Sequence, residues 1–145
     1  MIDSYFTYEG RDGTTVAARK WLPNKAGVDA APVRAVVQIV HGMAEHIGRY
    51  DHLAKFLAAN AGIVTAGHDQ RGHGRTAPSP HLLGRVHEDW EEMLYDVRLL
   101  SEQLRKLYPD RPLFLLGHSF GSLIVRAVVQ RGEIVPDGMI LSGTL

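Results

Sequence analysis

The sequence has 145 residues, 16 Lys+Arg balanced by 16 Asp+Glu, and no cysteine. The neutral balance argues against nucleic-acid binding or an anionic membrane surface, since both need a basic excess, and the missing cysteine excludes disulfides, thiolate zinc sites and a cysteine nucleophile. No apolar run is long enough to span a bilayer, and the first twenty residues carry charges without an apolar core, so we expect a soluble, cytoplasmic domain.

The N-terminal part predicts an antiparallel hairpin. Tyr5–Tyr8 and Thr14–Trp21 are short strand candidates, and Asp12-Gly13 between them is a strong turn signal. Pro23–Pro32 predicts a loop. Val33–Val40 is a near-continuous β-branched run, which is typical of a strand buried on both faces.

Beyond this strand, helical spacings alternate with apolar runs. In chain order we expect a helix carrying Tyr50, Leu53, Phe56 and Leu57, a strand at Ile63–Ala66, a loop at Gln70–Gly84, a helix at about His87–Leu107, a strand at Leu113–Leu116, a helix at Phe120–Arg131 and a strand at Gly138–Ser142. The long helix shows one apolar stripe formed by Trp90, Met93, Leu94, Val97, Leu100, Leu104 and Leu107. The order predicts an α/β fold: a mostly parallel sheet with helices on both faces and an N-terminal antiparallel hairpin.

Gly117-His118-Ser119-Phe120-Gly121 stands between an expected strand and an expected helix. Gly-x-Ser-x-Gly in that context is a nucleophile-elbow signature. A turn of about two residues exposes the serine hydroxyl, and side chains at positions 117 and 121 would collide across it, hence the glycines. The helix that follows points its amides at the centre where negative charge develops. We therefore expect Ser119 to be a nucleophile.

The loop after Val33–Val40 reads His41-Gly42-Met43-Ala44-Glu45-His46. In elbow architectures the second oxyanion donor is a backbone amide in this loop, which points to Met43, with the amide of Phe120 as the other donor. His41 is expected to order the loop through bonds to nearby backbone rather than to take part in the chemistry.

Asp69-Gln70-Arg71-Gly72-His73-Gly74 carries an acid and a histidine, but a triad is not expected from one short loop. The simpler interpretation is a carboxylate that caps backbone amides and an arginine that fixes the loop. His118 adjoins the serine, yet neighbours at an elbow point to different sides, so it is not expected to be the base. The histidines show no metal-ligand spacing, and we expect neither metal nor cofactor.

These motifs together resemble the α/β-hydrolase superfamily, in its monoacylglycerol lipase/lysophospholipase-like (serine aminopeptidase-like) group. The matching stretches are His41–His46 with Arg49-Tyr50, Asp69–Gly74 and Gly117–Gly121; the small departures are Thr76 and Ser122, where serine and glycine are usual. The resemblance implies Ser119 as nucleophile, Met43 and Phe120 as oxyanion donors, and hydrolysis of lipid-like acyl esters, such as acyl-glycerols or lysolipids, through an acyl-enzyme without a cofactor.

In this family the order is Ser, then Asp, then His. The chain ends at Leu145, about 26 residues after Ser119, so we expect residues 1–145 to be the N-terminal half of a single, truncated α/β-hydrolase domain. The acid, the base, the lid and the last strands would then be absent, and the isolated chain would be inactive. Two alternatives stay open. One is a non-catalytic half-domain or pseudo-enzyme that pairs with a partner chain or oligomerises through its open sheet edge. The other is a peptidase, thioesterase or haloperoxidase of the same fold.

Overall fold

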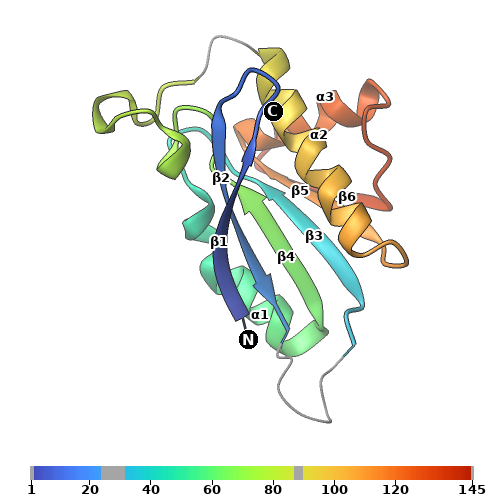
Figure 1. The fold of residues 1–145 in the computed structure, drawn as a ribbon. Coiled ribbons are helices and arrows are strands. Elements are labelled where there is room, and N and C mark those ends of the chain that lie inside the picture. The colour runs from blue at the N-terminus through green and yellow to red at the C-terminus, as the bar shows by residue number, and fades with distance from the viewer. Residues whose placement is uncertain (1, 24–31, 87–89, 145) are drawn as a thin grey trace.

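The computed structural model describes residues 2–23, 32–86 and 90–144. The described part of the chain forms a six-stranded sheet in the order β1-β2-β4-β3-β5-β6. The strands are β1 (Ile2–Glu9), β2 (Thr15–Leu22), β3 (Ala35–Val40), β4 (Ile63–His68), β5 (Leu113–His118) and β6 (Gly138–Ser142). β2 pairs antiparallel with β1 and β4, while β3 to β6 are parallel, which confirms the expected mixed sheet (Figure 1).

Three helices connect the parallel strands within the described residues: α1 (Asp51–Ala61), α2 (Trp90–Leu107) and α3 (Phe120–Gln130). Short 3-10 helices lie at Ile47–Tyr50, Gly74–Thr76 and Pro80–Leu82, the last two inside the expected loop. The loop expected between Pro23 and Pro32 and the helix start expected at His87 lie, for residues 24–31 and 87–89, outside the described residues.

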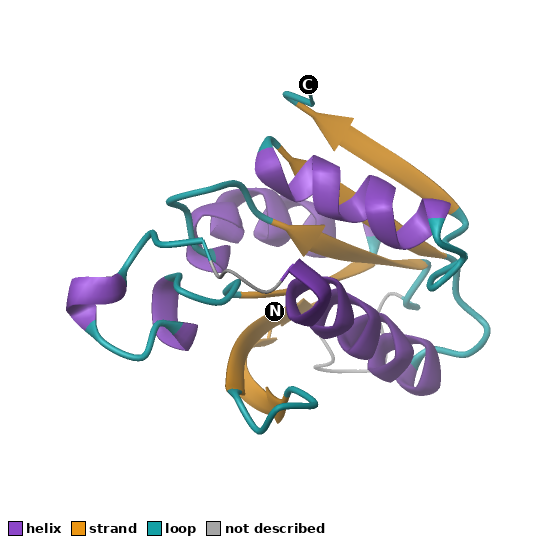
Figure 2. Ribbon diagram, turned by 90° about the horizontal axis from the view of Figure 1, so that it is seen from above, coloured by secondary structure: helices purple, strands orange, loops and turns teal. Residues whose placement is uncertain are grey.

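Successive side chains of each strand point to opposite faces of the sheet, and they contribute to two apolar layers. Val40 of β3 packs in a cluster with side chains of α2 and α3, whereas Val37 and Ile39 pack in a cluster with Ala54 of α1. Helices therefore cover both faces of the sheet, and Figure 2 views this arrangement from above. This is why the run in β3 is apolar at almost every position.

The helices match their predicted faces except at two places. Met93, Leu94, Val97, Leu100 and Leu104 of the α2 stripe are buried, but Leu107, in the last turn, is 64% exposed. In α1 the buried side chains are the small Ala54 and Ala58, and Phe56, which faces the other way, is 58% exposed. Small residues on the buried face let the helix lie close to the sheet.

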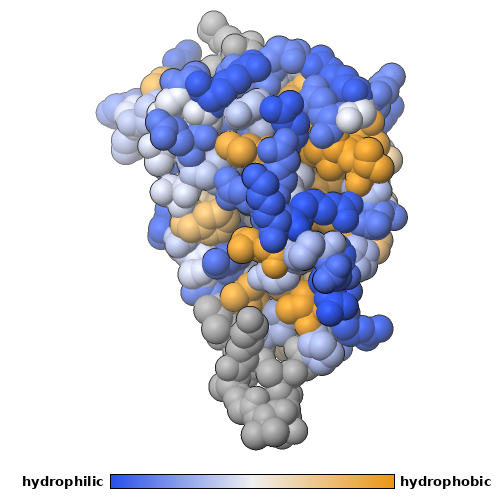
Figure 3. All heavy atoms as spheres, turned by 45° about the vertical axis from the view of Figure 1, so that its right-hand side comes forward, coloured by the Kyte–Doolittle hydropathy of each residue, from blue (hydrophilic) through white to orange (hydrophobic). Residues whose placement is uncertain are grey.

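β6 lies at one edge of the sheet and presents apolar side chains. Met139 and Ile140 are 45% and 47% exposed, and Val135 before the strand is 79% exposed. Figure 3, which turns the right-hand side of Figure 1 forward, shows apolar patches between hydrophilic side chains. In the described part of the chain, no helix is both long and apolar enough to cross a membrane.

Candidate active site

The loops that follow β3, β4 and β5 meet at one edge of the sheet, because the carboxyl ends of these parallel strands point the same way (Figure 1). Ser119 stands between β5 and α3 and is exposed. Its backbone has φ 50° and ψ −121°, a strained conformation for a residue that carries a side chain. The Ser119 amide donates to the carbonyl of Ser142 on β6 at 2.8 Å, which helps to hold this turn.

Both glycines of the elbow are needed sterically, for different reasons. A Cβ on Gly117 would lie 2.7 Å from the Gly121 oxygen, which is the expected collision across the turn. A Cβ on Gly121 would instead lie 2.1 Å from the carbonyl oxygen of Val40 at the end of β3. The second glycine therefore lets α3 approach the central strand.

Ser122 supports the elbow from the first turn of α3. Its amide and its hydroxyl both donate to the Ser119 carbonyl, at 2.9 and 2.6 Å. The hydroxyl at this position thus adds a hydrogen bond that glycine could not make.

The loop after β3 lies directly against the elbow. A Cβ on Gly42 would come within 3.2 Å of the Cβ of Ser119, so the two loops are in close contact. Met43 follows, with its side chain 52% exposed. Among the described residues, the amides of Met43 and Phe120 have no hydrogen-bond acceptor. The structure brings Ser119, Phe120 and the Met43 loop to the same edge of the sheet.

His41 orders this loop, as predicted. Its Nδ1–H donates to the Gly42 carbonyl at 2.7 Å, and its Nε2 accepts from the Gln70 amide at 3.0 Å. Burial lowers the pKa of His41 to about 4, so the ring is neutral, as this pattern of one donor and one acceptor requires. The imidazole joins the loop after β3 to the loop after β4.

The loop after β4 is also held as predicted. The Asp69 carboxylate accepts hydrogen bonds from the amides of Ile47 at 2.7 Å and Arg75 at 2.8 Å. Thr76 accepts from the Ala17 amide of β2 through its hydroxyl, at 3.0 Å. Both oxygens of Asp69 therefore cap backbone amides, which is the structural role expected of this carboxylate.

Arg71 anchors the same loop to two distant parts of the chain. Its guanidinium pairs with the carboxylates of Asp96 on α2 and Asp12 in the hairpin turn, with closest distances of 2.7 and 2.6 Å. The side chains of Arg71 and Asp96 are only 2% and 1% exposed. The buried Arg71–Asp96 pair thus fixes the loop after β4 to helix α2.

The described part of the chain places no base beside the serine. No imidazole or carboxylate there hydrogen-bonds to the Ser119 hydroxyl, and the His118 ring points to Ser142 on β6, with Nδ1 3.2 Å from its Oγ. No group of three metal-ligating side chains occurs among these residues.

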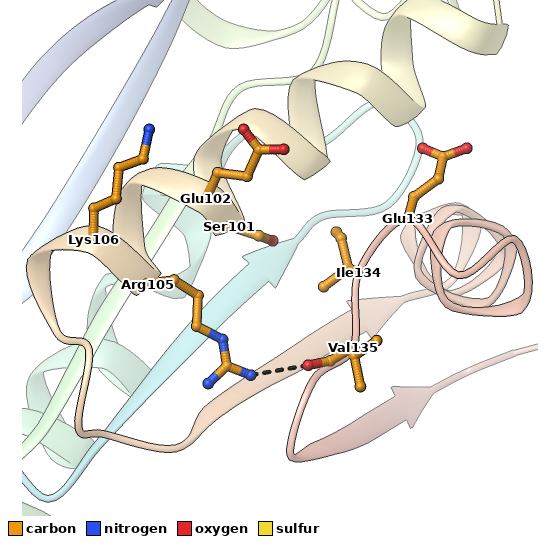
Figure 4. A pocket seen from close by; sticks show the side chains of 7 residues that line it. All are labelled: Ser101, Glu102, Arg105, Lys106, Glu133, Ile134 and Val135. Carbon is orange, nitrogen blue, oxygen red and sulfur yellow. Dashed lines mark hydrogen bonds between the residues drawn. The ribbon is translucent and has the colours of Figure 1, made fainter.

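Of two hollows on the surface, one lies near the edge of the sheet that carries Ser119 and the other lies away from it. One, of about 520 Å³, lies beside the loop after β3 and is lined by Ala44, Glu45, His46, His73, Gly74, Leu83 and Gly84. The other, of about 350 Å³, lies between the end of α2 and the segment before β6, where Arg105 donates to the Val135 carbonyl at 2.9 Å (Figure 4). The second is at the amino ends of β5 and β6, away from Ser119.

Sequence reasoning missed the side chains that support the loop after β3. Glu45 accepts from the Gly42 amide and the Tyr50 hydroxyl, both at 2.9 Å, and His73 accepts from the Ala44 amide at 3.0 Å. The motifs contain these residues, but no periodicity or spacing indicates which amide each one meets.

Comparisons with known proteins agree with this geometry. Residues 31–145 match the serine aminopeptidase S33 family. The chain is 37% identical over 141 residues to a monoacylglycerol lipase of Mycolicibacterium smegmatis, covering 97% of this chain and 46% of that protein. It is 34% identical to a mouse monoglyceride lipase, covering 92% of this chain and 41% of that protein.

Solved structures show the same relation. A carboxyl esterase from Bacillus coagulans superposes with a TM-score of 0.82 at 31% identity, over 97% of this chain and 44% of the esterase. A monoglyceride lipase from Saccharomyces cerevisiae gives a TM-score of 0.80 at 26% identity, over all of this chain and 45% of the lipase. The chain thus spans about half the length of these relatives. It belongs to the serine aminopeptidase S33 family of α/β-hydrolases and corresponds to the N-terminal half of its monoglyceride lipase-like members.

Proposed function

We propose that residues 1–145 are the nucleophile-bearing half of a single hydrolase domain that cleaves carboxylic esters with lipid-like acyl chains. The observation that carries this is Ser119: an exposed serine with φ 50° between a parallel strand and a helix, at the carboxyl edge of the sheet. The acyl-glycerol or lysolipid class of substrate is inferred from the monoacylglycerol and monoglyceride lipases that the chain resembles.

In the proposed reaction, the Ser119 Oγ attacks the ester carbonyl carbon and gives its proton to a general base. The negative charge that develops on the carbonyl oxygen is stabilised by the amides of Met43 and Phe120. Collapse of this intermediate expels the alcohol, which takes up the proton and leaves an acyl-serine. Water then attacks the acyl-serine in the same way, which releases the fatty acid and regenerates Ser119.

The base and its orienting acid are proposed to come from a polypeptide segment outside residues 1–145. No described imidazole contacts the Ser119 hydroxyl, and the chain matches only 46% of the Mycolicibacterium relative. An unactivated serine is a poor nucleophile at neutral pH, so the 145-residue chain by itself should be nearly inactive.

A serine-directed fluorophosphonate probe tests this function. Labelling of Ser119 is expected when the base-bearing segment is present, either continuous with the chain or added as a separate polypeptide, and is expected to be negligible without it. Ser119→Ala must abolish labelling, and Ser122→Ala, at a buried neighbouring serine, should not. Strong labelling of the 145-residue chain alone would contradict the assignment of the base. Hydrolysis of esters of graded acyl length, compared with that of matched thioesters and amides, would then separate lipase from thioesterase or peptidase activity.

The exposed edge strand favours a second function, a non-catalytic half-domain that pairs with another chain. Met139 and Ile140 of β6 are exposed, and open apolar edges recruit partners. Size-exclusion chromatography with light scattering distinguishes the two, because a clean, stable monomer argues against an obligate partner.

A further inference from the structure

We propose that Glu45 and His73 are positioning residues that fix the Met43 amide as an oxyanion donor. The proposal rests on the function proposed above, because it assigns a role in that reaction. It concerns three consecutive amides, those of Gly42, Met43 and Ala44. The first and the third are each held by a side chain, and the second has no acceptor among the described residues.

Glu45 holds the amide before the donor. Its Oε2 accepts hydrogen bonds from the Gly42 amide and the Tyr50 hydroxyl, each at 2.9 Å, and its Oε1 lies 3.1 Å from the Arg49 guanidinium. Burial alone would raise the pKa of Glu45, but these three partners outweigh it and hold the pKa below its usual value. The side chain is therefore a carboxylate with a fixed direction.

His73 holds the amide after the donor. Its Nε2 accepts from the Ala44 amide at 3.0 Å, and its Nδ1–H donates to the Arg71 carbonyl at 3.0 Å. The ring is buried and stands edge-on to that of His41, with centroids 5.4 Å apart. Since Arg71 is itself anchored by Asp96, the position of His73 is determined by the packed interior.

These two contacts matter because the loop is strained. Ala44 has φ 58°, a left-handed conformation that is strained for a residue with a side chain. Without Glu45 and His73, the peptides on either side of the Gly42–Met43 peptide would be free to rotate, and the His41 bond to the Gly42 carbonyl would be left to hold the donor. A donor displaced by about 1 Å loses much of its value, because it must meet the oxyanion and not the substrate carbonyl.

The test compares ester hydrolysis by Glu45→Ala and Glu45→Gln, with the base-bearing segment present. Alanine removes the acceptor, and kcat should fall about 100-fold with KM within about 2-fold of the parent, as for a lost oxyanion donor. Glutamine keeps an oxygen at the same place and should restore kcat to within about 5-fold. Glu102→Ala, at an exposed carboxylate of α2, is the matched control and should leave kcat unchanged.

His73→Ala is an independent test from the other side of the loop, with the same expected loss in kcat; it also decides the matter if Glu45→Ala does not fold. His52→Ala, at an exposed histidine of α1, is its control. Parent-like kcat in a folded Glu45→Ala or His73→Ala variant would overturn this inference while leaving the ester hydrolase intact. Absence of hydrolysis by the parent, or hydrolysis by Ser119→Ala, would instead overturn the proposed function.

Discussion

Replacement of Arg71 by methionine should strongly destabilise the fold. The change removes the cation that faces Asp96 at 2.7 Å, in a pair whose side chains are 2% and 1% exposed. Breaking such a buried pair costs about 3–5 kcal/mol, because the remaining charge is left without compensation. The lost bond to Asp12 adds less, since that carboxylate is 38% exposed and water screens it. We therefore expect Arg71→Met to lower the free energy of unfolding by about 4 kcal/mol in total.

This expectation is checked by urea unfolding at about pH 7.5, followed by far-UV circular dichroism, with a double-mutant cycle. Arg71→Met should lower the unfolding midpoint without changing the slope. Asp96→Leu in the same chain should recover at least about 2 kcal/mol, because the uncompensated charge is then gone. A loss below about 1 kcal/mol for Arg71→Met, or purely additive effects in the double variant, would refute the view that this network is a desolvated pair.

Two further predictions concern backbone contact and pH. Gly121→Ala should cost about 3 kcal/mol or more, because the new methyl meets the backbone oxygens of Val40 and His41, whereas Gly132→Ala, with open space around it but a φ of +70°, should cost only about 1–2 kcal/mol of backbone strain in the same urea assay. Burial lowers the pKa of His41 to about 4 and of His68 to about 3, from an ordinary 6.5, so the unfolded chain binds more protons below that value and stability falls as pH drops through it. Each group should cost roughly 2 kcal/mol by about pH 5; His68→Leu should remove its share when unfolding is measured at about pH 7 and 5, and an unchanged pH dependence would count against this reasoning.

Much of the fold could be predicted from the sequence, because strands, helices and the elbow depend on patterns of neighbouring residues. A strand between two helix layers must be apolar at almost every position, so the run ending at Val40 could be recognised as buried in a parallel sheet. The glycines around Ser119 marked the elbow, because a side chain at position 117 would meet Gly121 across the turn and one at position 121 would meet the end of β3. Phe56 could not be placed, since a helix packed on alanines leaves a larger side chain exposed.

The polar contacts of the site could not be predicted from the sequence, because many of them join residues that are far apart along the chain. Arg71 meets Asp12 across 59 positions and Asp96 across 25, and such pairs form only once the sheet has brought their loops together. Polar side chains at a loop carry no period that reveals a partner. The motif therefore indicated which loops matter, and only the fold shows which amide Glu45 or His73 holds.

The hydrogen bond from the Ser119 amide to the Ser142 carbonyl has a consequence for how Ser119 keeps its strained backbone conformation. The strand that receives this bond is the outermost one in the described sheet and is exposed on Met139 and Ile140. Fraying of that strand would remove a restraint on the strained serine before any change in the elbow itself. A segment or molecule that pairs with β6 would therefore also stabilise the backbone conformation of Ser119, because the two are joined by this hydrogen bond.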